Sequence, residues 1–333
     1  MKTTKQLITA ILINGTGSIK RIAELMGYKR HDKVLRRLRK LGVKVKEKIE
    51  GKVKEMLRET AGEVVLILDD TVLDKMWGKA TVWVYKLYSS KHRRVIGGIG
   101  LVMLLAVVGK WRIPLGFRIY KRKEDGKSRI DLALEMLMWA IEELGIKPSA
   151  VVMDSWYASR KILQYLQQKG VRYMTRIKKN RLVMPLGANA YLRVDELVDD
   201  IPPEGVLVKM KGVGIVRLFA FPSRAITNGG SGSVKFYVSN DVDVSREELE
   251  EMMKMRWQIE EVFKVLKQVF SLDKFFVRHP LSILGFIGVS FIGFLLAEKI
   301  RFMKGFSHYE LQQRLRRLGR SALYHRRNPL LAL

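Results

Sequence analysis

The chain has 333 residues, 47% of them hydrophobic, so it is long enough to fill a sizeable core in one large domain or in several smaller ones. Its formal charge of +29 comes from 62 Lys and Arg against 33 Asp and Glu, an excess that a soluble enzyme does not need and that is typical of proteins following phosphate backbones. The lack of cysteine excludes disulfides and thiolate metal sites, which leaves carboxylates and five histidines as possible ligands for a hard cation such as Mg²⁺ or Mn²⁺.

The N-terminal residues predict a helical region over residues 1–60. No cleavage site follows the short apolar run at the start of the chain, so we expect a cytoplasmic location. Residues 4–13 and 19–26 predict two helices, and a third, basic helix follows Tyr28. A helix, a turn and a basic helix are the outline of a helix-turn-helix, with a small helical bundle as the alternative. The predicted DNA-binding residues of this region are Arg36, Arg37, Arg39 and Lys40.

Two short apolar runs end in acidic residues. Residues 64–68 lead into Asp69 and Asp70, and residues 150–153 lead into Asp154. Such runs predict strands buried on both faces of a sheet. A carboxylate just past the end of a buried strand lies where sites are usually built, although an Asp there can also cap a helix. Strand parity leaves Asp69 as a rival to Asp70.

The remaining elements up to residue 240 alternate between strands and helices. The predicted order is a strand ending at Asp70, a hairpin over 96–108 and 111–120, a helix over 131–144, the strand ending at Asp154, a helix over 162–168, a strand over 171–177 and a β-rich insertion over 181–240.

Two stretches carry aromatic residues that could meet nucleic acid. Residues 75–94 interleave Trp and Tyr with Lys and Arg, which suits either stacking on unpaired bases or ordinary strand packing. The β-rich insertion contains no Trp, so an unpaired base there would have to stack on another aromatic ring. The candidates are Phe219, Phe221, Tyr191 and Tyr237.

A long helix capped by Ser245 carries a third acidic candidate. Its apolar residues recur every three or four positions, and a turn of about 100° per residue places Arg256, Glu260 and Lys267 on one face. Glu261 is turned toward solvent. The alternative is a solvated face in which Glu260 pairs with Lys264, worth only a few tenths of a kcal/mol.

Residues 281–297 are apolar but contain several Gly and Ser residues. We expect a buried helix covering the sheet and no membrane span. The tail from 314 to 327 is basic enough to bind phosphate or to keep the chain soluble.

These features resemble the DDE transposases of bacterial and archaeal insertion sequences, in the group with a Tyr-x2-Arg-x3-Glu-x6-Lys signature. Arg256, Glu260 and Lys267 match its spacing, and Met253 occupies its Tyr position, which removes one hydroxyl. The first two acids of the family correspond to Asp70, which precedes a Thr, and to Asp154. The resemblance covers roughly residues 60 to 300.

The resemblance implies an α/β fold: a ribonuclease H-like mixed five-stranded sheet with helices, a β-rich insertion domain and an N-terminal helical DNA-binding domain. The expected parts are residues 1–60, the helical region; 61–180, the first part of the catalytic core; 181–240, the insertion; 241–305, the second part of the core with the Glu260 helix; and 306–333, a basic C-terminal tail.

The implied activity is metal-dependent cleavage of transposon ends and strand transfer into target DNA by two-metal phosphoryl transfer. Asp70, Asp154 and Glu260 would be the catalytic residues and would hold two divalent ions, Mg²⁺ or Mn²⁺. Arg256, Lys264 and Lys267 would contact DNA. The expected partners are the terminal repeats, the target DNA and a second copy of the chain, at the nucleoid of a prokaryotic cytoplasm and away from any membrane.

Two further interpretations stay open. A non-enzymatic or domesticated DNA-binding protein could have kept the same fold, and it would bind DNA without metal and without cleavage. A structural RNA-associated basic protein would prefer A-form duplexes. Charge alone gives affinity for both nucleic acids, so competition between DNA and RNA at a stated salt concentration is needed to separate them.

Overall fold

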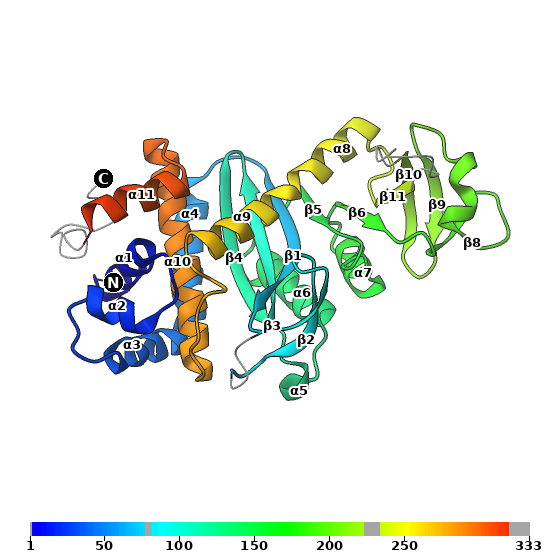
Figure 1. Cartoon of the computed structure of the whole chain (residues 1–333). Coiled ribbons are helices and arrows are strands. Elements are labelled where there is room, and N and C mark those ends of the chain that lie inside the picture. Colours follow the sequence, from blue (N-terminus) through cyan, green and yellow to red (C-terminus); the bar gives the residue numbers. More distant parts are fainter. Residues whose placement is uncertain (1, 77–80, 223–233, 320–333) are drawn as a thin grey trace, which may run out of the picture. The chain divides into compact units, whose positions relative to one another are not determined.

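The computed structural model describes residues 2–76, 81–222 and 234–319 (Figure 1). The chain divides into two compact units. Unit 1 contains Met1–Gly62, Asp70–Ser128 and Glu260–Leu333, and unit 2 contains Glu63–Asp69 and Arg129–Ile259. The unit boundaries fall inside one strand, β1, and one helix, α9, so each of these elements contributes to both units.

Unit 1 begins with a group of helices, as the sequence predicted. The last part of the predicted helical region forms helix α4. Ser18 caps α2 by accepting a hydrogen bond from the backbone N–H of Arg21. The helices are α1 (Lys2–Asn14), α2 (Ile19–Leu25), α3 (Asp32–Val43) and α4 (Val45–Glu59).

Helix α10 (Pro280–Lys304) is the apolar helix of unit 1. It is long and apolar enough to cross a membrane, but 78% of its apolar stretch is buried inside the protein. It lies against α3, α4 and strand β4 (Figure 1), so the predicted buried helix is present. It approaches α3 closely, since a Cβ added at Gly285 would lie 2.0 Å from the carbonyl oxygen of Leu38.

The strands of unit 1 include the predicted hairpin. β3 (Arg94–Val108) pairs antiparallel with β4 (Trp111–Ile119) and, nearer its start, with β2 (Tyr85–Ser89). β3 also neighbours β1 (Val64–Asp74). β1 is longer than the sequence predicted, because its polar residues after Leu68 stay beside β3 although the predicted strand ended at Asp70. Two short elements complete the unit, α5 (Arg122–Asp125) and α11 (His308–Leu318).

In unit 2 the first part of β1 begins a mixed sheet. β5 (Ala150–Met153) is parallel to β1, and β6 (Tyr173–Ile177) is parallel to β5. The strands of the predicted insertion continue this sheet, because β11 (Val234–Ser239) pairs antiparallel with β6. The strand order is β1-β5-β6-β11-β10-β9-β7-β8. The added strands are β7 (Leu182–Pro185), β8 (Leu192–Arg193), β9 (Val206–Met210) and β10 (Gly214–Pro222).

The helices of unit 2 follow the predicted order. α6 (Arg129–Met138) continues into a π-helical turn (Trp139–Glu143), α7 (Arg160–Gln168) joins β5 to β6, and a 3-10 helix (Val194–Asp200) lies in the insertion. The α/β fold class and the predicted succession of strand, hairpin, helix, strand, helix and strand are therefore confirmed. The sheet is not limited to five strands, since the insertion extends it.

The long helix predicted from Ser245 onward is divided at Arg256. Ser245 caps α8 (Arg246–Met255), whose N-terminal amide at Glu248 donates to the Ser245 hydroxyl, and α9 (Trp257–Gln268) follows after one residue. The sequence has no Gly or Pro at this point, so nothing in its pattern marks the division.

Candidate functional site

The register of β1 and β5 explains where the acidic residues lie in unit 2. The last paired residues are Leu68 of β1 and Met153 of β5. Asp69 and Asp154 follow directly, and both side chains are half-buried. The apolar runs therefore bury the two strands and place Asp69 and Asp154 at the same level, whereas the predicted acid Asp70 lies one residue further along β1.

The carboxylate of Asp154 is held by the turn that follows it. Its Oδ1 accepts a hydrogen bond of 2.7 Å from the backbone N–H of Trp156. The carbonyl oxygen of Asp154 accepts another from Tyr157, whose ring is fully buried. Because this Asx-type turn uses one carboxylate oxygen, Asp154 has a fixed direction at the end of β5.

Asp69 has a charged partner. Nη1 of Arg256 donates to Oδ2 of Asp69 over 3.2 Å, and both side chains are largely buried. This bond ties the junction of α8 and α9 to the end of the β1–β5 pairing within unit 2. It gives Asp69 a structural partner, and it gives Arg256, which was predicted to contact DNA, a role inside the protein.

Lys267 contacts the continuation of β1 in unit 1. Its ammonium donates to the hydroxyl of Thr71 over 2.6 Å and to the carbonyl oxygen of Val72 over 3.2 Å. Burial lowers the pKa of Lys267, because a low-dielectric surrounding disfavours the charged form. The ammonium of Lys267, which was predicted to contact DNA, therefore already donates hydrogen bonds to β1 next to Asp70.

Glu260 and Glu261 of α9 differ in burial, as the helical spacing predicted. Glu260 is half-buried, whereas Glu261 is 68% exposed and pairs with Arg112 over 3.2 Å. Lys264 is exposed and could meet a ligand from solvent. The observed burial therefore fits Glu260 as the sheltered carboxylate of the pair and Glu261 as a surface residue.

The three predicted acids are shared between the units, with Asp70 and Glu260 in unit 1 and Asp154 in unit 2. Within the described ranges, no group of three or more His, Asp or Glu side chains could hold a metal ion. The donors nevertheless fit the predicted cation in chemistry, since Mg²⁺ and Mn²⁺ prefer carboxylate oxygens.

Comparison with known proteins places these residues in a family. A family model described as "Transposase DDE domain" matches residues 60–292, which include all three acids. The chain belongs to the transposase DDE domain family. No curated protein matches it. Among solved structures, the "Cryo-EM structure of piggyBac transposase synaptic complex with hairpin DNA" is 15% identical, has a TM-score of 0.45, and the match covers 80% of this chain and 55% of that one.

Ahead of the matched transposase domain, the predicted DNA-binding residues lie on α3. Arg36, Arg39 and Lys40 are exposed, while Arg37 is half-buried with its guanidinium 4.6 Å from the ring centre of Tyr28. The apolar side of α3 is buried, so its basic side faces solvent. Arg37 and Lys40 also line a hollow of about 580 Å³. These positions are compatible with DNA contact, which stays a prediction.

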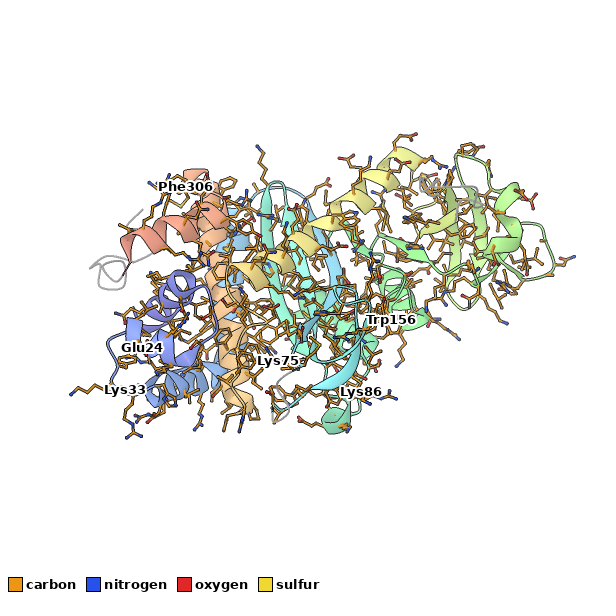
Figure 2. The ribbon with its side chains drawn as sticks, viewed as in Figure 1. Glu24, Lys33, Lys75, Lys86, Trp156 and Phe306 are labelled. Atoms are coloured by element: carbon orange, nitrogen blue, oxygen red, sulfur yellow. The ribbon has the colours of Figure 1, made fainter. Side chains whose placement is uncertain are left out.

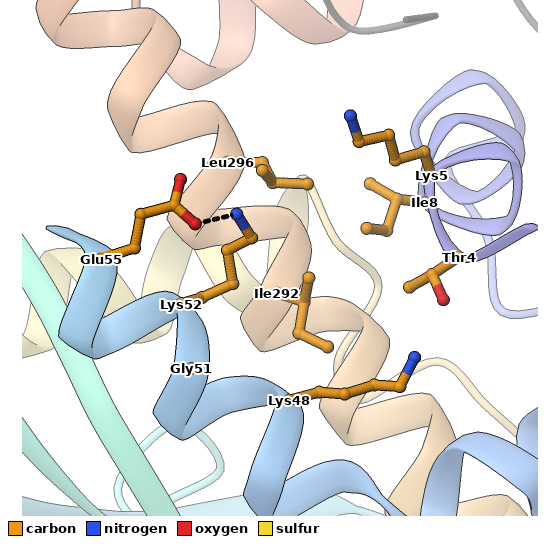
Figure 3. A pocket seen from close by; sticks show the side chains of 9 residues that line it. All are labelled: Thr4, Lys5, Ile8, Lys48, Gly51, Lys52, Glu55, Ile292 and Leu296. Carbon is orange, nitrogen blue, oxygen red and sulfur yellow. Dashed lines mark hydrogen bonds and ion pairs between the residues drawn. The ribbon is translucent and has the colours of Figure 1, made fainter. Parts of the chain in front are cut away.

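A second hollow of unit 1 lies among α1, α4 and α10 (Figure 3). It has a volume of about 240 Å³ and is lined mainly by apolar atoms. The carboxylate of Glu55 in its lining is paired with Lys52, as the dashed line in Figure 3 shows. This lining suits packing between helices better than transposase chemistry.

The aromatic residues proposed for base stacking are mostly buried. Phe219 is fully buried, so its predicted stacking role is wrong, and Phe221 and Tyr237 pack against the same apolar cluster. In the stretch 75–94, Trp83 is buried and donates to Glu124 over 2.6 Å, and residues 77–80 lie outside the described residues.

The sequence prediction missed Trp156, a ring that is 52% exposed (Figure 2). Its position two residues after Asp154 was the available signal. The turn is anchored by the buried side chains of Tyr157 and Ala158, so the ring of Trp156 stays exposed.

Proposed function

We propose that the chain is the DNA transposase of an insertion sequence, which cuts the ends of the element and joins them to target DNA. The observation that carries the proposal is the family match over residues 60–292, which spans Asp70, Asp154 and Glu260. The net charge of +29 supports a polyanionic partner. DNA, as terminal repeats and target, is therefore the proposed partner.

Asp70, Asp154 and Glu260 are the proposed catalytic acids. Asp70 stays the proposed acid of the first strand, with Asp69, whose carboxylate accepts a hydrogen bond from Arg256, as its rival. Asp154 is the proposed acid of the second strand because the turn that follows fixes its carboxylate at the end of β5. Glu260 is preferred to Glu261 because it is the sheltered member of the pair, while Glu261 meets Arg112 at the surface.

The proposed cofactor is a pair of divalent ions, Mg²⁺ or Mn²⁺, held by these three carboxylates. When bound, such ions supply activation of the attacking hydroxyl and stabilisation of the leaving oxygen in phosphoryl transfer. The acids' own task is to present oxygen ligands in fixed positions. Burial of Val65 to Leu68 and of β5 keeps the strands that carry Asp70 and Asp154 rigid.

The basic residues divide into two proposed tasks. Arg256 and Lys267 are positioning residues. Arg256 donates a hydrogen bond to the residue before Asp70, and Lys267 donates one to the residue after it. Lys264 and the exposed residues of α3 are the proposed phosphate contacts, because their charges face solvent. A homodimer assembled on DNA, in a prokaryotic cytoplasm, completes the proposal.

Nicking of supercoiled plasmid by the purified full chain tests the proposal. We expect open-circular DNA in the presence of Mg²⁺ or Mn²⁺ and none when a chelator is added. Element ends supplied as duplexes should increase the yield and become joined to the plasmid. Tight DNA binding without any cutting, with or without metal and ends, would overturn the enzyme and favour the non-enzymatic DNA-binding protein.

Competition between duplexes tests the substrate class. At one stated salt concentration, a DNA duplex should displace labelled DNA more effectively than an RNA duplex of the same sequence. A preference for the RNA duplex would contradict the proposed substrate and favour an RNA-associated protein.

A further inference from the structure

Trp156 is an exposed aromatic ring on a firmly anchored turn of unit 2. Trp156, which is labelled in Figure 2, is 52% exposed, whereas the next two residues, Tyr157 and Ala158, are buried. Its own backbone N–H donates to the Asp154 carboxylate over 2.7 Å. A Trp ring gains much from burial, so a rigid turn that presents it to solvent leaves a large apolar face available for a ligand.

Two cations lie close to this ring. The guanidinium of Arg129, at the start of α6, is 5.6 Å from the ring centre, and the ammonium of Lys178, just after β6, is 5.2 Å from it. Both distances are in the range of cation–π attraction. A base that stacks on this ring would take the place of one of these cations, whose charge would then lie beside the adjoining phosphate.

A basic pocket adjoins the ring through Ser155 and Lys178. It has a volume of about 620 Å³, and none of the described residues that line it is Asp or Glu. Arg193 at its edge is paired with Asp195, with bonds of 3.0 and 2.7 Å. In the described part of the chain, no carboxylate forms an ion pair with the other cations of the pocket, which are Arg176, Lys178, Lys179 and Lys235.

The charges of the pocket come from neighbouring strands of one sheet. Arg176 and Lys178 lie at the end of β6, and Lys235 lies on β11, which pairs with β6 through Tyr237 and Arg176. Because both strands belong to one rigid sheet, the cations stay close together despite their mutual repulsion. Such a concentration of positive charge favours a polyanion as the partner.

We infer that Trp156 and this basic pocket bind an unpaired stretch of DNA, with a base stacked on the indole ring and phosphates held by Lys178, Arg176 and Lys235. The inference rests on the proposed function for its choice of DNA. Bases inside a duplex are already stacked on each other, so an exposed indole selects a strand whose bases are free. Because Trp156 follows Asp154 by two residues, a strand stacked there runs beside a proposed catalytic acid.

Fluorescence anisotropy with a labelled single strand of about 15 nucleotides, and with the matching duplex, tests the inference in the full chain without added metal. Trp156→Ala should weaken binding of the single strand about tenfold or more, because one base–aromatic stack is lost, and change duplex binding less than about twofold. Trp156→Phe should restore most of the affinity. Circular dichroism checks that each variant is folded.

Two matched controls sharpen this test. Trp257 is also exposed and has a cation, Arg256, 5.5 Å from its ring, but it does not adjoin the pocket. Trp257→Ala should keep the preference for the single strand. Lys178→Gln should reduce the slope of log affinity against log salt by about 0.7 for the single strand, whereas Lys209→Gln, an exposed position on β9, should leave it unchanged.

The inference is overturned if Trp156→Ala binds the single strand as the wild type does, or if it loses single strand and duplex equally. The assignment to DNA would also be overturned if Trp156→Ala weakened binding of an RNA single strand of the same sequence but not binding of the DNA single strand. Failure of the proposed function is a separate outcome: a chain that binds unpaired DNA through Trp156 but never nicks a plasmid keeps this inference and loses the transposase activity.

Discussion

The ammonium of Lys267 donates a hydrogen bond of 2.6 Å to the hydroxyl of Thr71. It joins the end of α9 to the residue after Asp70 on β1, within unit 1. A hydrogen bond from a charged group contributes about 1.5–3 kcal/mol. The position of a proposed catalytic acid therefore depends on a lysine that the family signature would assign to DNA.

Replacing this lysine should separate positioning from DNA contact. We expect Lys267→Met to lower the melting temperature and the nicking rate while changing duplex affinity less than about twofold, because the lost bonds lie inside the protein. Lys264→Met removes an exposed charge three residues earlier. It should leave the melting temperature unchanged and reduce the salt slope of duplex binding by about 0.9. The opposite pattern in the two variants would assign the DNA contact to Lys267.

Asp69 and Asp70 should respond differently to loss of charge. Asp69→Asn weakens the bond with Arg256, so we expect a cost of about 1–3 kcal/mol in the free energy of unfolding, measured by urea denaturation. Asp70→Asn should abolish nicking in protein that remains folded and binds DNA. If Asp70→Asn still cuts, and Asp69→Asn is stable but inactive, then Asp69 is the catalytic residue.

Much of the fold follows from the sequence because its apolar patterns are local. A few neighbouring residues are enough to predict the strands before Asp69 and Asp154, the hairpin and the amphipathic helices. The length of β1 could not be predicted in this way. Its residues after Leu68 are mixed in polarity, and they extend the strand only because β3 lies beside them.

The candidate residues could be proposed from the sequence, but their hydrogen bonds could not. The pairs of Arg256 with Asp69 and Lys267 with Thr71 join residues 187 and 196 positions apart, so no spacing rule reveals them. The sequence also failed to show which aromatic rings are exposed and could stack on a base. Phe219 and Trp156 differ in burial through packing against distant segments, which a local pattern does not contain.

The close contact of α10 with α3 should make Gly285 sensitive to a single added methyl group. A Cβ there would lie 2.0 Å from the Leu38 carbonyl oxygen, which is backbone, so Gly285→Ala must push the helices apart and should cost about 1–3 kcal/mol or more. Gly51 in α4 is the matched control. An added Cβ would meet nothing within 4 Å, and Gly51→Ala should stabilise the helix by about 0.5–1 kcal/mol. Thermal melting measures both, and equal effects would contradict the packing.

Glu298 makes the stability of the chain depend on acid pH. Burial alone would raise the pKa of this carboxyl, but the bonds with His308 and Arg301 and the charge of Arg112 lower the pKa to about 2. Because the pKa is lower in the folded state, the stabilisation is fully present above the ordinary value of about 4.5 and is lost as the pH falls toward 2. The loss should be about 3 kcal/mol, since one pKa unit corresponds to about 1.4 kcal/mol.

Burial lowers the pKa of His308, so its protonation on acidification below its ordinary value of 6.5 also destabilises the folded state. Urea denaturation between pH 7 and pH 3 should show the free energy of unfolding falling in the wild type. Glu298→Gln should be less stable at neutral pH and should show a flatter profile. A profile in the variant as steep as that of the wild type would assign the acid sensitivity to other groups.

Glu260 is the proposed catalytic acid of α9, and the most direct test compares it with its neighbour Glu261. Supercoiled plasmid is incubated with Mg²⁺ and the wild type, Glu260→Gln or Glu261→Gln, each at equal duplex occupancy. Glu261 is an exposed residue in a surface pair, which contributes about 0–1 kcal/mol to stability, so its variant should cut like the wild type. We predict that Glu260→Gln binds DNA normally and cuts at least about a hundredfold more slowly. Equal cutting by the wild type and Glu260→Gln would contradict the account.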